Sequence, residues 1–228
     1  MPEIETLPYA LQRLPDDTAI AHAESFCAKL KERRTCRFFS DAPVPRLVIE
    51  AAIAAAGSAP SGANHQPWHF AVIASPDKKR AIREAAEAEE RRLYGADGAD
   101  PKASGEWLDA LGPLGTDADK PFLETAPWLI VVFAQRKGGI AEDGETQNYY
   151  VNESVGIACG MLLATLHEAG IATLTHTPSP MGFLREVCAR PDWEKPVMIV
   201  VAGHPASDAR VPAHALVKKP LTQIASWL

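Results

Sequence analysis

Hydrophobic and polar positions along this chain follow a helical spacing in some segments and a strand spacing in others. Helical spacing predicts helices over residues 18–34, 47–57, 76–94 and 149–169, and a short one near Arg185. Alternating or continuous apolar runs predict strands over residues 68–74 and 127–135, from 171 onward, and over 197–202. This order predicts an α/β (α+β) fold in which helices cover a central sheet.

Several segments interrupt this pattern. Residues 58–67 and 175–180 are rich in residues that form turns, which predicts loops. Residues 94–119 combine Gly, Asp and Pro with one short apolar patch, and they indicate a lid insertion over an active site at about 87–121. The whole chain, residues 1–228, is expected to form a single domain that includes this lid, with a tail after Gly203 that reaches onto a partner subunit.

Composition narrows the classes of function. The chain has 228 residues and a formal net charge of −6, which disfavours nucleic acid as a partner. Neither a signal peptide nor a membrane span is recognisable, so we expect a cytoplasmic protein without a membrane partner. The four cysteines form no CxxC pair and the histidines show no paired spacing, so no metal site is expected.

Two segments offer groups that could hold a phosphate or a planar ring. The guanidinium groups of Arg33, Arg34 and Arg37 match phosphate oxygens, although a charged turn of this kind can also be merely solvated. Residues 59–67 provide the Ser61 hydroxyl and backbone amides, although they can equally form an ordinary connection. There is no GxGxxG motif after a strand and no P-loop, so a nucleotide-like cofactor must be held in another way.

A series of short motifs runs through the chain after about residue 30. They occupy residues 33–38 (RRTCRF), 59–63 (APSGA), 67–68 (PW), 125–127 (TAP), 149–154 (YYVNES), 157–160 (IACG), 173–178 (TLTHTP) and 219–221 (KPL). Together they resemble the motifs of the nitroreductase superfamily, and in particular of its iodotyrosine deiodinase family. The resemblance implies a nitroreductase-like fold with a central mixed sheet flanked by helices, and an intertwined homodimer that binds FMN at the subunit interface.

The resemblance also assigns roles to residues of this chain. FMN binding falls on Arg33, Arg34, Thr35, Cys36, Arg37, Pro60, Ser61, Thr175, His176, Thr177 and Lys218. The hydroxyl of Thr177 is the catalytic group, because it would contact the flavin N5. Lys218 replaces an arginine of the animal enzymes and can meet phosphate only as a point charge. The backbone amide of Ala63 would meet the substrate phenolate.

A further trio of residues resembles the substrate site of the deiodinase family. Glu90 would take the ammonium of a zwitterionic amino acid, and Tyr94 and Lys120 would take its carboxylate. Glu90 and Tyr94 stand four residues apart on one predicted helical face, and the two opposite charges match the two ends of a zwitterion. Without the resemblance, a glutamate near a lysine is a common surface feature.

The function implied is FMN-dependent reductive dehalogenation of halotyrosines. The electrons would come ultimately from NAD(P)H, and a flavin or ferredoxin-type reductase is a possible partner. A broad nitroreductase or quinone reductase on the same fold is the alternative. A flavin-cleaving dimethylbenzimidazole synthase and a non-catalytic flavin-binding dimer are further alternatives, and the trio Glu90, Tyr94 and Lys120 argues against the first of these two.

Overall fold

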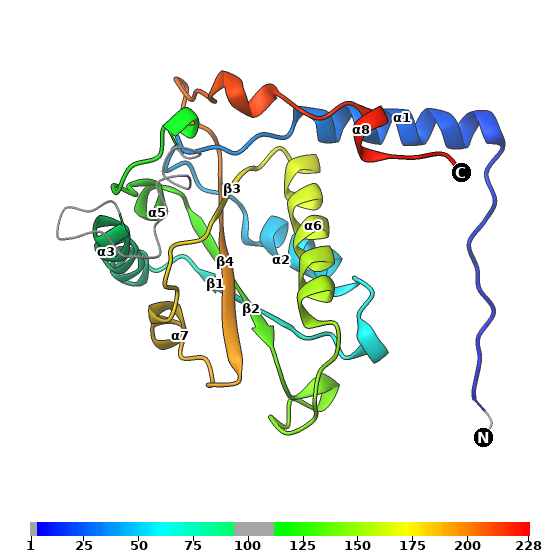
Figure 1. The fold of residues 1–228 in the computed structure, drawn as a ribbon, viewed down its shortest axis with the longest axis horizontal. Helices are drawn as coiled ribbons and strands as arrows, with labels where there is room; N and C mark the ends of the chain where they lie inside the picture. The colour runs from blue at the N-terminus through cyan, green and yellow to red at the C-terminus, as the bar shows by residue number, and fades with distance from the viewer. Residues whose placement is uncertain (1–3, 94–111) are drawn as a thin grey trace. The chain divides into compact units, whose positions relative to one another are not determined.

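A four-stranded sheet forms the centre of the unit Arg34–Leu228 in the computed structural model, which describes residues 4–93 and 112–228 (Figure 1). The strands are β1 (Trp68–Ile73), β2 (Trp128–Gln135), β3 (Ala172–His176) and β4 (Glu194–Gly203), in the order β1-β2-β4-β3. All three pairings are antiparallel. In the described residues, the one parallel contact recorded is an isolated bridge between Thr35 and Thr173. The mixed sheet implied by the resemblance is therefore corrected, for the described strands of this chain, to an antiparallel sheet, since strand direction depends on how distant segments pair.

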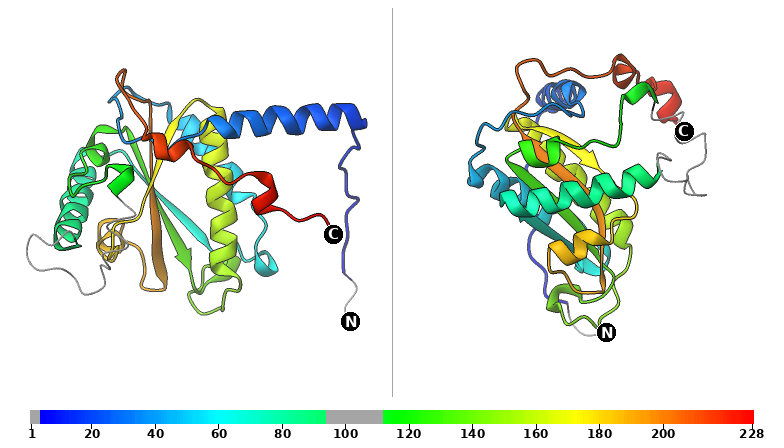
Figure 2. Two further views of the ribbon diagram at one scale, coloured as in Figure 1. Left: turned by 45° about the horizontal axis from the view of Figure 1, so that its top comes forward. Right: turned by 90° about the vertical axis from the view of Figure 1, so that its left-hand side faces the viewer.

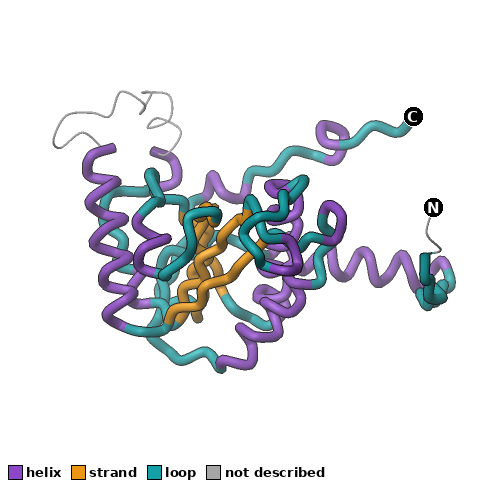
Figure 3. The backbone as a smooth tube through the Cα atoms, turned by 90° about the horizontal axis from the view of Figure 1, so that it is seen from below, coloured by secondary structure: helices purple, strands orange, loops and turns teal. Residues whose placement is uncertain are grey.

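Helices cover both faces of this sheet (Figures 1 and 3). One face carries α2 (Arg46–Gly57) and α6 (Val151–Glu168). The opposite face carries α3 (Pro76–Leu93), α5 (Phe122–Thr125) and α7 (Phe183–Val187), and Figure 2 shows α3 and α7 on the same side of the strands. Short elements complete the described chain: α8 (Leu221–Ile224) and the 3-10 turns η1 (Gly62–Asn64), η2 (Gly112–Leu114), η3 (Gly139–Ala141) and η4 (Ala213–Leu216).

Side chains of β2 alternate between two cores. Ile130 and Val132 pack in the core that contains α2 and α6. Leu129 and Val131 pack in the core that contains α3, α5 and α7. All four side chains are fully buried, because successive residues of a strand point to opposite faces and helices cover both. The continuous apolar run that predicts this strand reflects that double burial.

Most predicted elements are confirmed, with boundaries that move by a few residues. β3 continues to His176, so the loop expected from residue 175 begins later. α1 (Asp16–Glu32) lies in a separate unit, Met1–Arg33, and buries none of its residues. Most of the predicted lid, residues 94–111, lies outside the described residues. None of the helices in the described ranges is both long and apolar enough to cross a bilayer.

Gly203 ends β4 at a point where no side chain fits. A Cβ atom there would lie 2.7 Å from Pro127 Cδ and 3.2 Å from Phe39 Cδ1. Gly203→Ala is therefore expected to lower the free energy of unfolding by about 1–3 kcal/mol through overpacking. Gly57→Ala is the matched control, because a Cβ at Gly57 meets nothing within 4 Å. Equal stability of the two variants in urea unfolding would contradict this close contact.

Candidate active site

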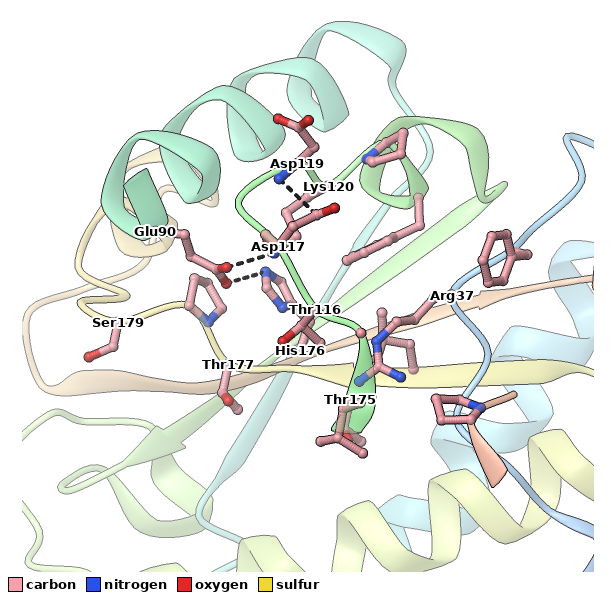
Figure 4. A pocket seen from close by; sticks show the side chains of 18 of the residues that line it. Arg37, Glu90, Thr116, Asp117, Asp119, Lys120, Thr175, His176, Thr177 and Ser179 are labelled. Atoms are coloured by element: carbon pink, nitrogen blue, oxygen red, sulfur yellow. Dashed lines mark hydrogen bonds and ion pairs between the residues drawn. The ribbon is translucent and has the colours of Figure 1, made fainter. Parts of the chain in front are cut away.

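A pocket with a volume of about 800 Å³ lies beside the end of β3 in the unit Arg34–Leu228 (Figure 4). Its wall is formed by α3, by residues 114–122, and by the end of β3 with the loop that follows. The volume is in the range typical of sites for small molecules. Six residues predicted from the sequence lie in this wall: Arg37, Glu90, Lys120, Thr175, His176 and Thr177.

Glu90 and Lys120 form an ion pair in this wall. The Nζ atom of Lys120 lies 2.6 Å from Oε2 of Glu90, and the two side chains are only 5% and 11% exposed, respectively. Lys120 Nζ also donates to the carbonyl oxygen of Asp117. Burial raises the pKa of Glu90, and the hydrogen bond and charge of Lys120 oppose that rise. Two groups that the sequence predicts for opposite ends of a zwitterion are thus partners of each other in this structure.

Helix α3, which carries Glu90, is fixed by hydrogen bonds to α5 and to Ala126, the residue after it. Lys79 Nζ donates to the carbonyl oxygens of Glu124 and Ala126, at 2.7 and 2.9 Å. The Nε atom of Arg83 donates to Glu124 Oε1 at 2.5 Å. Burial lowers the pKa of Lys79, and the nearby Glu124 opposes this. These contacts hold α3 in place, and with it the position of the Glu90 carboxylate.

Lys120 is also held through its backbone. Its N–H group donates to Oε1 of the buried Glu87 at 2.8 Å. The other oxygen of Glu87 lies 3.1 Å from a guanidinium nitrogen of Arg83 and 3.1 Å from one of Arg91. The segment that carries Lys120 is therefore attached to α3 independently of the ion pair with Glu90.

The end of β3 presents its side chains to two different surroundings. Thr175 and Thr177 are exposed, whereas His176 between them is buried. The ring of His176 packs edge-on against Phe122, with 5.6 Å between ring centroids. Because strand side chains alternate, the two threonines share one side and His176 takes the other, toward Glu90 (Figure 4).

The stability of the protein is expected to fall below about pH 6.5 in a way that depends on His176. Burial, reinforced by the charges of Lys120 and Arg37, lowers the pKa of His176 from 6.5 to about 3. Between these values the unfolded chain binds a proton that the folded chain does not, so the free energy of unfolding decreases as pH falls. His176→Phe should reduce the slope of the free energy of unfolding against pH by up to about 1.4 kcal/mol per pH unit. Chemical unfolding from neutral to mildly acidic pH measures it, and an equally steep profile in the variant would contradict the burial.

A comparison with known protein families identifies the chain. Residues 30–204 match the model described as the nitroreductase family. The chain belongs to the nitroreductase family. The matched range contains all four strands of the sheet and most of the pocket wall of this nitroreductase-family protein.

Several relatives of the chain are named iodotyrosine deiodinase. The chain is 46% identical over 206 residues to iodotyrosine deiodinase of Haliscomenobacter hydrossis, and the match covers 90% of each of the two chains. It is 40% identical over 226 residues to iodotyrosine deiodinase of Nematostella vectensis, covering 97% of this chain and 83% of the relative. It is 40% identical over 223 residues to iodotyrosine deiodinase 1 of Homo sapiens, and the match covers 97% of this chain and 74% of the relative. The resemblance noted in the motifs is thus confirmed across most of the chain.

Solved structures support the same fold. The crystal structure of oxidized iodotyrosine deiodinase bound to FMN and 3-iodo-L-tyrosine matches with a TM-score of 0.67 and 28% identity, covering 80% of this chain and 90% of that chain. A nitroreductase with bound FMN from Bacteroides fragilis matches with a TM-score of 0.63 and 18% identity, covering 89% and 98%. The second likeness bears on the fold alone.

The remaining predicted residues of this nitroreductase-family chain do not line the pocket. Those in the same unit are Arg34, Thr35, Cys36, Pro60, Ser61, Ala63 and Lys218. Arg33 belongs to the other unit, and Tyr94 lies outside the described residues. The thiol of Cys36 is buried in the core and donates to the carbonyl oxygen of Phe38 at 3.1 Å. Burial raises the pKa of this thiol, so its side chain acts as a neutral core group.

The loop around Ser61 has a fixed backbone. The Ser61 hydroxyl accepts a hydrogen bond from the N–H of Gln66 at 2.9 Å. Ala63 and Gln66 adopt positive φ angles of 51° and 53°. A Cβ atom on Gly62 would lie 2.7 Å from the carbonyl oxygen of Tyr149, so only glycine fits at this position. The loop thus presents backbone groups in a defined geometry at some cost in conformational strain.

The pocket wall also contains residues that the sequence did not point to. Thr116, Asp117 and Arg210 all line it. Arg210 lies in the irregular segment after β4, where neither periodicity nor a recognised motif marks it. Only the folded path of that segment brings its side chain to the pocket.

Proposed function

We propose that this protein is an FMN-dependent enzyme that removes the halogen from halotyrosines with electrons from NAD(P)H. The observation that carries the proposal is the buried pair of Glu90 and Lys120 in the pocket wall. A carboxylate and an ammonium in one small pocket match the two charged ends of a free amino acid. The identity of 46% to a deiodinase supports the assignment of that amino acid to the halotyrosine class.

The residues present fit FMN. The cofactor needs a cation for its phosphate and polar groups beside its ring. Arg37 and the exposed residues Thr175 and Thr177 offer these groups in the pocket wall. We assign the remaining contacts to residues outside this wall: Arg33, Arg34, Thr35, Cys36, Pro60, Ser61 and Lys218. When bound, FMN supplies the two electrons that it has received from a reduced nicotinamide.

The chain's own contribution is to bind and orient the substrate. A zwitterion can replace the single pair of Glu90 and Lys120 by two pairs, ammonium to Glu90 and carboxylate to Lys120, so that no buried charge remains alone. A ligand with only one of these charges leaves Glu90 or Lys120 without a partner. We assign a second contact with the carboxylate to Tyr94 and a contact with the phenolate to the backbone amide of Ala63. The hydroxyl of Thr177 is assigned to the flavin N5.

We further propose that the active form is a homodimer. Ile157 on α6 is exposed, and Cβ atoms on its neighbours Gly156 and Gly160 would meet nothing within 4 Å. The tail also exposes large apolar residues, namely Leu216, Val217, Leu221, Ile224 and Trp227. Surfaces of this kind mark protein contacts. Sedimentation of the holoprotein at the 24.6 kDa of one chain would contradict the proposal. A cytoplasmic location stays a prediction.

The activity is tested by the products of the reaction. 3-Iodotyrosine and NAD(P)H should give tyrosine, iodide and NAD(P)+, as the C–I bond breaks and a C–H bond forms. Chromatography of tyrosine and an iodide electrode measure both products, with a chemical reductant or a partner reductase replacing NAD(P)H as needed. Reduction of nitroaromatics or quinones without any consumption of 3-iodotyrosine would overturn the proposal in favour of a broad reductase.

Loss of Arg37 should weaken FMN binding. A hydrogen bond between charged groups contributes about 1.5–3 kcal/mol, so Arg37→Ala is expected to raise the Kd for FMN by about 10-fold or more. Fluorescence titration of the apoprotein with FMN measures the change. The matched control is Arg46→Ala, because Arg46 is exposed on α2 and pairs there with Glu50. Equal affinity in the two variants would contradict the role of Arg37.

A further inference from the structure

His176 carries a buried nitrogen atom that lacks a partner. The side chain lines the pocket and is only 9% exposed. Its Nε2 atom has no hydrogen-bond partner in the described parts of the chain. Oε1 of Glu90 lies 4.0 Å away, which is too far for a direct hydrogen bond. Buried polar atoms in proteins are nearly always satisfied, so a group from outside the chain is the expected partner.

The position of this nitrogen points to the substrate rather than to the flavin. Thr175 and Thr177, on either side of His176 at the end of β3, are exposed, whereas His176 is buried against Phe122. Figure 4 shows its ring turned toward Glu90. The free Nε2 atom is therefore next to the carboxylate that we assign to the ammonium of the substrate.

We propose that Nε2 of His176 and Oε1 of Glu90 together form the binding site for the ammonium group of the amino-acid substrate. This inference rests on the proposed function and adds to it a residue that selects amino acids over des-amino analogues. If an ammonium nitrogen lay about 2.9 Å from both atoms, the angle Nε2–N–Oε1 at that nitrogen would be roughly 90°. That angle suits two of its three N–H donors.

The charge state of the ring is compatible with this role. Burial, together with the charges of Lys120 and Arg37, lowers the pKa of His176 to about 3, so the ring is neutral at neutral pH. A neutral imidazole with its proton on Nδ1 offers Nε2 as an acceptor. In the ligand-free structure Glu90 Oε2 pairs with Lys120, whereas Oε1 is the oxygen next to Nε2. Once Lys120 turns to the carboxylate of the ligand, the ammonium can take up Oε1 and Nε2 together.

The test compares two ligands that differ only in the ammonium group. His176→Phe keeps an aromatic ring against Phe122 but removes the acceptor, and His176→Gln restores an acceptor near the position of Nε2. Flavin fluorescence gives the Kd of the FMN-loaded variants for 3-iodotyrosine and for 3-(3-iodo-4-hydroxyphenyl)propanoate. We expect His176→Phe to raise the Kd for 3-iodotyrosine by about tenfold or more. The Kd for the des-amino acid should stay nearly unchanged, and His176→Gln should recover part of the loss.

Other outcomes overturn the inference, each in a recognisable way. An equal loss for both ligands would mean that His176 only supports the pocket by packing. No loss for either ligand would remove its role. A proton on Nε2 in the complex, seen in the ¹⁵N spectrum of the ring, would show that His176 donates to Glu90 instead of accepting from the ligand. If the unaltered protein bound 3-iodotyrosine no better than the des-amino acid, the proposed function itself would fail and the inference with it.

Discussion

Lys120→Met and Glu90→Gln are each expected to raise the Kd for 3-iodotyrosine by at least about 30-fold. Truncating one member of a buried, hydrogen-bonded charge pair costs about 2–5 kcal/mol in binding, because the other charge is left unpaired. In each variant one end of the bound zwitterion would face an uncharged side chain inside a pocket where both native side chains are almost fully buried. Flavin fluorescence titration of the holoprotein measures the Kd.

Two variants on α3 that do not alter the pocket wall serve as controls for this prediction. Glu89→Gln removes the neighbouring carboxylate on α3, which pairs with Arg92 at 3.0 Å and does not line the pocket. Lys78→Met removes an exposed ammonium from the same helix. Both should bind 3-iodotyrosine as the unaltered protein does, and all four variants should retain FMN. Unchanged affinity in Lys120→Met and Glu90→Gln would remove the zwitterion assignment.

Glu194→Ala is expected to lower the free energy of unfolding by about 3–5 kcal/mol, because it breaks a buried charged network. Glu194 begins β4 with a fully buried side chain. Arg190 donates to its two oxygens at 2.7 and 2.6 Å, and Gln135 donates at 3.0 Å. Burial would raise the pKa of Glu194, but the hydrogen bonds from Arg190 and Gln135 hold it below its usual value. Urea unfolding of the holoprotein measures the loss.

The matched control for this network is Glu186→Ala. Glu186 is an exposed glutamate on α7, close in sequence to Arg190. Its replacement should change the free energy of unfolding by no more than about 0.5 kcal/mol, as is usual for surface positions. A loss of the same size in both variants would mean that the network around Glu194 contributes nothing specific.

The pattern of apolar positions predicts where most elements lie but not how the strands run. The run in β2 is fully buried on both faces, and that burial is what makes its strand recognisable. Strand direction depends on how distant segments pair. The antiparallel pairing of Leu129 with Val201, for example, joins residues far apart in the chain, and no local signal encodes it.

Part of the candidate site also follows from the sequence, and part does not. The motifs point to Glu90 and Lys120, but their mutual ion pair depends on how residues 112–121 return to α3. His176 is predicted together with its flanking threonines as one loop. Once β3 includes His176, strand alternation places it on the opposite side, next to Glu90. Roles that depend on which way a side chain points therefore require the fold.

A crystal structure of the FMN-loaded protein with 3-iodotyrosine would show directly whether Glu90 and Lys120 hold the two ends of the substrate. We expect the ligand ammonium to lie about 3 Å from the Glu90 carboxylate and the ligand carboxylate to lie at a similar distance from Lys120 Nζ. The ligand would then stand between two side chains that contact each other in the present structure. A bound halotyrosine that leaves Glu90 and Lys120 still paired with each other, or turned out to solvent, would contradict it.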